Sequence, residues 1–105
     1  MSAEQIEQFV YALKIYLSIT WEDPADDARL AEIVRAGAAY LNQKNGAPAD
    51  YQTPGLPRTI LMEYARYARD NALDVFENNY QSMILSMQHD SLVEQFKAAQ
   101  EAQSK

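Results

Sequence analysis

The spacing of apolar residues along the chain predicts helices almost throughout. The first runs from about Ala3 to Leu17, where apolar residues recur at steps of three and four between polar ones. Pro24 cannot continue a preceding helix but suits the first turn of the next, and Asp23 stands where it can cap that turn. A second helix is therefore expected from Pro24 to about Gln43.

Two glycines in the second helical region carry information about its packing and its end. Gly37, in mid-helix, costs about 1 kcal/mol relative to alanine, so it indicates either a close helix crossing or a simply tolerated glycine. Gly46 fits the left-handed position that follows a helix C-terminus. Residues 47–56 hold two prolines and a glycine, which predicts the one substantial loop of the chain.

The strongest amphipathic pattern follows this loop. A third helix is expected from Pro57 to about Glu77, with its apolar side buried and its alanines allowing another helix to come close. The apolar side comprises Ile60, Leu61, Tyr64, Ala65, Ala68, Ala72, Val75 and Phe76.

Two interruptions are expected after this helix. Asn78 and Asn79 tolerate turns and compete with helical hydrogen bonds, so the third helix should stop there. The run SMILSMQ, residues 82–88, favours helix, and a second break is expected at residues 89–91. The sequence thus predicts an all-α protein, a small bundle of three main helices plus a C-terminal helical segment.

Length and composition agree with one domain that spans residues 1–105. Its core is expected at about 4–88, and residues 89–105 should form a helical tail that frays at its end. Cysteine is absent, which excludes disulfides and thiolate metal sites. The first residues lack the pattern of a secretory signal, and no apolar run reaches the roughly 18 to 20 residues of a membrane span, so we expect a soluble protein.

Charge and motifs exclude several kinds of function. Fifteen acidic and nine basic residues give a net charge of -6, which disfavours sequence-specific nucleic-acid binding. There is no phosphate-binding glycine loop, nucleophile elbow or HExxH motif. His89 has no neighbouring partner residues for catalysis and is expected to be a polar surface residue. We therefore expect no enzyme, no metal site and no cofactor.

An acidic group surrounds the start of the second helix, and it comprises Glu22, Asp23, Asp26 and Asp27. These carboxylates could hold a hard cation, but they lack the alternating ligands and central glycine of an EF-hand loop. Capping of a helix N-terminus, where negative charge is favourable, is the stronger interpretation.

Tyrosine and arginine point to contact surfaces. Tyr11 and Tyr67 lie off the main apolar stripes of their helices, so they are either rims of the core or part of a protein interface. Arg58, Arg66 and Arg69 are likewise either a solvated face or a joint between subunits. Because acidic and basic residues are segregated, Asp26 and Asp27 of one copy are predicted to meet Arg66 and Arg69 of the next, beside Tyr67.

The order of these features resembles the head-tail connector proteins of tailed double-stranded DNA phages. The resemblance covers roughly residues 6–88 and rests on two runs, YALKIYLSITWEDPADDARLAEIVRAGAAYLNQKNG and LMEYARYARDNALDVFENNYQSMILSMQ. It is carried by helix-packing signatures, among them the Ile-Thr-Trp and acidic-proline junction at residues 19–27, and by no catalytic motif.

This resemblance implies a structural protein of the virion. Such connectors are mostly helical, form a ring, commonly of twelve copies, beneath the portal, and extend the DNA channel toward a stopper or tail component. DNA would pass without sequence-specific binding, and assembly would take place in the host cytoplasm. For the contact with the portal we expect Met83, Met87 and Phe96, although Met83 and Met87 also fit an ordinary core.

An alternative from another class is a prophage-encoded regulatory module, not an enzyme, that grips one partner protein. Such a module should expose one apolar patch, whereas a ring-forming connector should expose contact surfaces on two opposite flanks. A small helical enzyme would instead need a pocket with convergent polar groups, to which no pattern points.

Overall fold

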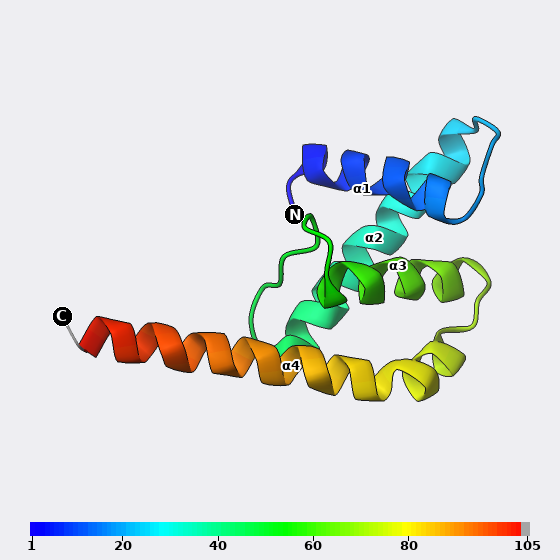
Figure 1. Ribbon diagram of the computed structural model, residues 1–105. Helices are drawn as coiled ribbons and strands as arrows, with labels where there is room; N and C mark the ends of the chain where they lie inside the picture. The colour runs from blue at the N-terminus through cyan, green and yellow to red at the C-terminus, as the bar shows by residue number, and fades with distance from the viewer. Residues whose placement is uncertain (104–105) are drawn as a thin grey trace.

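Four α-helices make up most of the computed structural model, which describes residues 1–103 (Figure 1). They are α1, Ala3–Tyr16; α2, Pro24–Asn45; α3, Leu56–Arg69; and α4, Leu73–Gln103. The all-α prediction, with three helices and a C-terminal helical segment, is confirmed. The last two residues of the expected fraying tail lie outside the described residues.

The helix boundaries of the first half follow from capping. The Ser2 hydroxyl accepts from the backbone N–H of Gln5 at 3.1 Å, while the Gln5 side chain accepts from the backbone N–H of Ser2 at 2.9 Å. Asp23 accepts from the N–H of Ala25 at 3.0 Å, with Pro24 in the first turn of α2. Gly46 ends α2 with a φ of 76°, the left-handed conformation that was predicted.

The centre of the bundle is a close crossing of α2 over α3. A Cβ added at Gly37 would lie 2.6 Å from Tyr64 Cδ1 and 2.7 Å from Leu61 Cδ1, so any larger residue there would force these side chains to shift. The close-crossing interpretation of Gly37 is confirmed. Around it the large side chains with less than 2% exposure form the core; they are Phe9, Leu13, Leu30, Val34, Leu41, Ile60, Leu61 and Phe76.

The third helix is shorter than predicted, because α3 ends at Arg69 and α4 begins at Leu73. Asn71 takes a φ of 56°, and the N–H of Ala72 donates to the carbonyl of Tyr67 at 2.8 Å, which closes the turn. The turn lets α4 fold back along α3. Phe76 therefore reaches the core from a different helix than the predicted one.

The two predicted interruptions are absent, since α4 continues through residues 78–79 and 89–91. Asn78 and Asn79 are exposed, so their amides do not have to compete for the helical backbone. Val75, predicted on the buried stripe, is 42% exposed. Val75 was expected to be buried because residues 57–77 were predicted to form one helix. The turn at residues 70–72 divides this region into two helices, so Val75 no longer lies on the buried side of α3.

The loop between α2 and α3 is held to the bundle by one tyrosine. Tyr51 is buried, and its hydroxyl donates to Asn42 Oδ1 at 2.7 Å. Arg58 Nη1 donates to the carbonyl of Tyr51 at 3.0 Å. Burial raises the pKa of the Tyr51 phenol to about 12.

The molecule is elongated because α4 extends beyond the other three helices. Its dimensions are 53 × 31 × 18 Å, and the last turns of α4 extend beyond the other helices (Figure 1). α1 lies on the opposite side of α2 and α3 from α4, and no Cα atom of α1 comes within 8 Å of one in α4. The two outer helices therefore cannot cover each other within one chain.

Candidate interaction surfaces

Asp26 and Arg69 were predicted to meet between two copies, but in the structure they pair within one chain. Arg69 Nη2 lies 3.1 Å from Asp26 Oδ2, and both side chains are largely covered. The Arg69 guanidinium also lies 5.8 Å from the centre of the Trp21 ring, and Arg29 donates to the Arg69 carbonyl at 3.3 Å. These contacts tie the start of α2 to the end of α3.

The remaining charges of the predicted joint are also paired within the chain. Lys14 Nζ lies 3.0 Å from Asp27 Oδ1, and Arg66 Nε lies 2.8 Å from Glu63 Oε2. The charge segregation in the sequence thus has an explanation inside one subunit. A role for Asp26, Asp27, Arg66 and Arg69 between subunits stays a prediction, and their charges no longer motivate it.

Tyr67 belongs to an aromatic cluster where α3 meets α4. It is half-buried, with its ring centre 6.1 Å from that of Phe76 and 5.9 Å from that of Tyr80. The Arg66 guanidinium covers it at 5.1 Å. The rim-of-core interpretation therefore holds for Tyr67, whereas Tyr11 lies in the open.

Glu63 joins two helices through its carboxylate. Tyr16 at the end of α1 donates to Glu63 Oε1 at 2.7 Å, while Arg66 pairs with Oε2. Desolvation, followed by this hydrogen bond and the Glu63 charge, raises the pKa of Tyr16 to about 12. The phenol stays protonated as a donor, which suits a structural link.

The three residues expected to contact the portal have very different environments. Met87 is only 3% exposed and lies in the core, so it cannot serve as a docking residue without unfolding of that region. Met83 is half-buried against the same core. Phe96, on the free part of α4, is 64% exposed, and it alone of the three offers a contact surface.

Most of the exposed large hydrophobic side chains lie at two places on the molecule; Met1 at the start of the chain and Leu73 and Val75 at the start of α4 lie outside both. The first is on α1 and the loop after it, and its members are Tyr11, Ile15, Tyr16 and Trp21. The second is on α4, and its members are Leu85, Leu92, Val93 and Phe96. Tyr11, Ile15 and Phe96 are 71%, 65% and 64% exposed, the highest values among the large hydrophobic residues described as exposed. Exposed groups of this kind are typical of protein interfaces.

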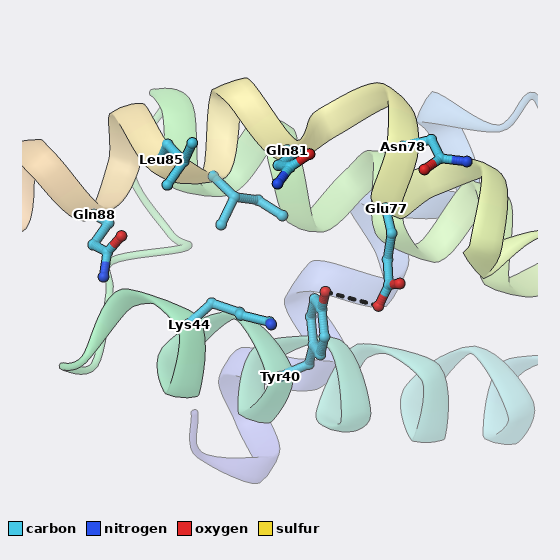
Figure 2. Close-up of a pocket in the computed structure, with 8 residues that line it drawn as sticks. Tyr40, Lys44, Glu77, Asn78, Gln81, Leu85 and Gln88 are labelled. Atoms are coloured by element: carbon cyan, nitrogen blue, oxygen red, sulfur yellow. Dashed lines mark hydrogen bonds between the residues drawn. The ribbon is translucent and has the colours of Figure 1, made fainter.

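A groove of ≈ 380 Å³ separates α2 from α4 (Figure 2). Tyr40 on α2 donates to Glu77 Oε1 on α4 at 3.0 Å, and Lys44 lies 5.6 Å from the Tyr40 ring centre. Desolvation and the bond to Glu77 raise the pKa of Tyr40. On the α4 wall Gln81 and Gln88 add side-chain amides, and Leu85 adds an apolar side chain. This lining offers hydrogen bonds and apolar contact rather than a nucleophile with a base.

A second groove, of ≈ 540 Å³, lies between α1 and α2. Ile6, Val10 and three alanines form its apolar lining, which Tyr11 also joins. Lys14 and Arg35, also in the lining, are paired with Asp27 and with Glu32 respectively. Glu7 and Glu22 also line the groove, and neither forms a salt bridge within residues 1–103. The groove therefore offers an apolar floor with a partly acidic edge.

The acidic group at the start of α2 acts in capping and pairing. Asp23 caps α2, Asp26 pairs with Arg69, and Asp27 pairs with Lys14. Within residues 1–103 no cluster of three or more acidic or histidine side chains could hold a metal ion. The single histidine, His89, is exposed on α4, as predicted.

No family model, curated protein or solved structure matches the chain. Among the described residues, no helix combines the length and apolar character needed to cross a bilayer.

Proposed function

We propose that this protein is a non-enzymatic structural subunit, a head-tail connector of a tailed phage that assembles as a ring beneath the portal. The observation that carries the proposal is the separation of its two exposed apolar groups, one on α1 and its loop and one on α4, on opposite sides of the bundle. Different surfaces at opposite ends suit head-to-tail contacts, which close into rings when the rotation between copies allows it.

The shape of the chain supports the same proposal. A compact core and a helix that projects beyond it suit a subunit that is completed by neighbours. A regulatory module that grips one partner would need one such apolar group, and the second would then be unused. The proposed partners are other copies of the chain, a portal protein and a stopper or tail-completion protein.

The proposal places the protein in the virion, at the junction of head and tail, after assembly in the host cytoplasm. DNA would pass through the ring without sequence-specific contact, in keeping with a net charge of -6. The resemblance of residues 6–88 to connector proteins supports this assignment. Which residues meet the portal stays open in the proposal, because Met83 and Met87 lie against the core.

The test is the molar mass of the full chain, measured by light scattering, alone and after mixing with the portal ring of the same phage. A connector should join the portal in one complex with a fixed, cyclic number of copies. A chain that elutes unchanged in the presence of the portal would overturn the proposal. Binding of a single copy to some other phage or host protein would favour the regulatory module.

A further inference from the structure

A smaller pocket, of ≈ 260 Å³, lies where the loop between α2 and α3 meets α4. Asn45 at the end of α2 and Met87 on α4, each only 3% exposed, are the most buried residues of its lining and form its floor. Pro48 and Pro57 add apolar walls. The pocket therefore has an apolar interior with one polar side chain in its floor.

Three carboxylates lie around this pocket. They belong to Asp50, on the loop, and to Asp90 and Glu94, one turn apart on α4. None of the three forms a salt bridge within residues 1–103. Asp50 accepts hydrogen bonds from the backbone N–H groups of Gln52 at 2.8 Å and Thr53 at 3.2 Å, which hold the loop but leave its charge unbalanced.

The basic side chains that are nearest in the sequence do not line the pocket. Lys44 and Arg58 each lie over an aromatic ring elsewhere, with the charged group 5.6 Å and 5.2 Å from the ring centre. Lys97, one turn beyond Glu94, forms no salt bridge with it in the part of the chain that the structure describes. The negative charge around the pocket can therefore be balanced by a cation from another molecule.

A second, independent observation comes from the floor of the pocket. Asn45 Nδ2 donates to the carbonyl of Ala47 at 2.9 Å, which fixes the orientation of the amide. Asn45 Oδ1 is buried, and it accepts from no donor among residues 1–103. Buried polar atoms are almost always paired, so this oxygen calls for a donor that enters the pocket.

The arrangement of these acceptors selects the kind of cation. A metal ion does not fit, because residues 1–103 contain no group of three acidic or histidine side chains that could hold one. The acceptors come instead from α2, the loop and α4, with apolar side chains between them. An ammonium group on a hydrocarbon stem has three donors that point in different directions, and its stem can be buried while its head stays polar.

We propose that this pocket binds a primary alkylammonium group. The hydrocarbon stem packs on Met87 and the two prolines, and the head donates to Asn45 Oδ1 and to the surrounding carboxylates. Such a group is carried by a lysine side chain of another protein and by free aliphatic diamines. This binding site goes beyond the connector function and does not depend on it.

The test titrates Nα-acetyl-lysine N-methylamide into the isotope-labelled full chain at about 0.15 M salt, where distant charges are screened. Two-dimensional NMR should show the amide signals of residues 49–50 and 90–94 shifting to saturation. The norleucine derivative has the same stem without the ammonium, and it should bind about tenfold more weakly. Equal affinity of the two compounds, or no saturable shift with the lysine derivative, would overturn the proposal.

The role of the carboxylates is tested with Asp90→Asn and Glu94→Gln in one chain, since both side chains are exposed and the fold does not rest on them. This double variant should bind the lysine derivative about fivefold more weakly. The matched control, Glu4→Gln with Asp74→Asn, removes the same charge from exposed positions outside the pocket, and it should change the affinity by less than about twofold. Equal weakening by both would indicate a general attraction to an acidic chain and overturn the site.

Cadaverine, an aliphatic diamine, distinguishes the two sources of the ammonium group. If it binds the wild-type chain more tightly than the lysine derivative does, the site is one for a free diamine, whose second head meets another of the carboxylates. If it binds no more tightly, the site is one for a lysine side chain of a partner protein. Both results require that the Asp90→Asn and Glu94→Gln variant lose affinity; cadaverine that binds this variant unchanged would overturn the proposal.

Discussion

The crossing of α2 over α3 and the projecting part of α4 differ in whether other parts of the same chain cover their apolar side chains. At the crossing, Gly37 lets Tyr64 and Leu61 come so close that a side chain at this position would have to displace them. Along the last turns of α4, Leu92 and Phe96 touch nothing in the chain that would cover them. The first region holds the fold together, whereas the second leaves apolar side chains exposed.

The periodicity of apolar residues does not by itself distinguish a helix side that is buried in the core from one that is exposed. Phe76 and Phe96 lie on the same helix, yet Phe76 is fully buried and Phe96 is 64% exposed. What separates them is whether a second element of the same chain reaches them. The stability of the fold and the association of copies should therefore respond to different substitutions.

The largest effect is expected from Phe76→Ala. Removing this buried ring, which packs against Tyr64, Tyr67 and Tyr80, should lower the free energy of unfolding by about 3 to 5 kcal/mol. Phe96→Ala, the matched change on the exposed part of α4, should change it by less than about 0.5 kcal/mol. Denaturant unfolding followed by circular dichroism measures both values. Equal destabilisation by the two variants would remove the distinction between core and interface.

A smaller loss is expected from Gly37→Val. Its side chain would meet Tyr64 and Leu61 at the crossing, and such overpacking should destabilise the fold by about 1 to 3 kcal/mol. Ala36→Val, at the neighbouring exposed position of α2, is the control and should cost less than about 0.7 kcal/mol. Thermal unfolding distinguishes the two; a Gly37→Val variant as stable as the control would show that the crossing is not tight.

The pair of Asp26 and Arg69 should contribute about 1 kcal/mol, because its side chains are partly covered and hydrogen-bonded. A double-mutant cycle with Asp26→Ala and Arg69→Ala measures this coupling in the monomer at low concentration. If the coupling appeared only at concentrations where copies associate, Asp26 and Arg69 would instead pair between subunits, as the sequence suggested. Arg66→Ala combined with Asp26→Ala serves as the control, since no contact joins Arg66 to Asp26.

A further effect appears only at alkaline pH. Burial raises the pKa of Tyr51 from 10.0 to about 12, so the folded state holds this proton more tightly than the unfolded state does. Stability should be fully present below pH 10 and decline as the pH rises from about 10 to 12. Tyr51→Phe should weaken that decline without abolishing it, because the pKa of Tyr16 is raised as well. Identical pH profiles for the two proteins would contradict the assignment to Tyr51.

Much of the fold could be predicted because local signals decided it. Asp23 caps α2, Gly46 ends it, and the two prolines of residues 47–56 mark the loop. These signals act within four residues of the place they determine. The turn between α3 and α4 was misplaced because Asn78 and Asn79 favour a turn as strongly as Asn71 does. Burial of Phe76 against α3, a tertiary effect, selected Asn71.

The interaction surfaces were harder to predict, since the sequence shows that charges are segregated but not which partner each one takes. Arg69 reaches Asp26 only because α3 ends beside the start of α2. The apolar side of the last helix did leave a signal, the recurrence of Asp90, Glu94, Lys97 and Glu101 on the opposite side. That signal becomes clear once residues 73–103 are known to form one uninterrupted helix.

The most direct test of head-to-tail association uses two variants that each destroy one surface, Ile15→Glu and Phe96→Glu. Analytical ultracentrifugation should show that the wild-type chain grows in mass with concentration and that each variant alone remains a monomer. An equimolar mixture should form a heterodimer and nothing larger, because only one intact pair of surfaces remains. Dimers of Ile15→Glu alone, or a mixture that stays monomeric while the wild type associates, would contradict the proposed head-to-tail association.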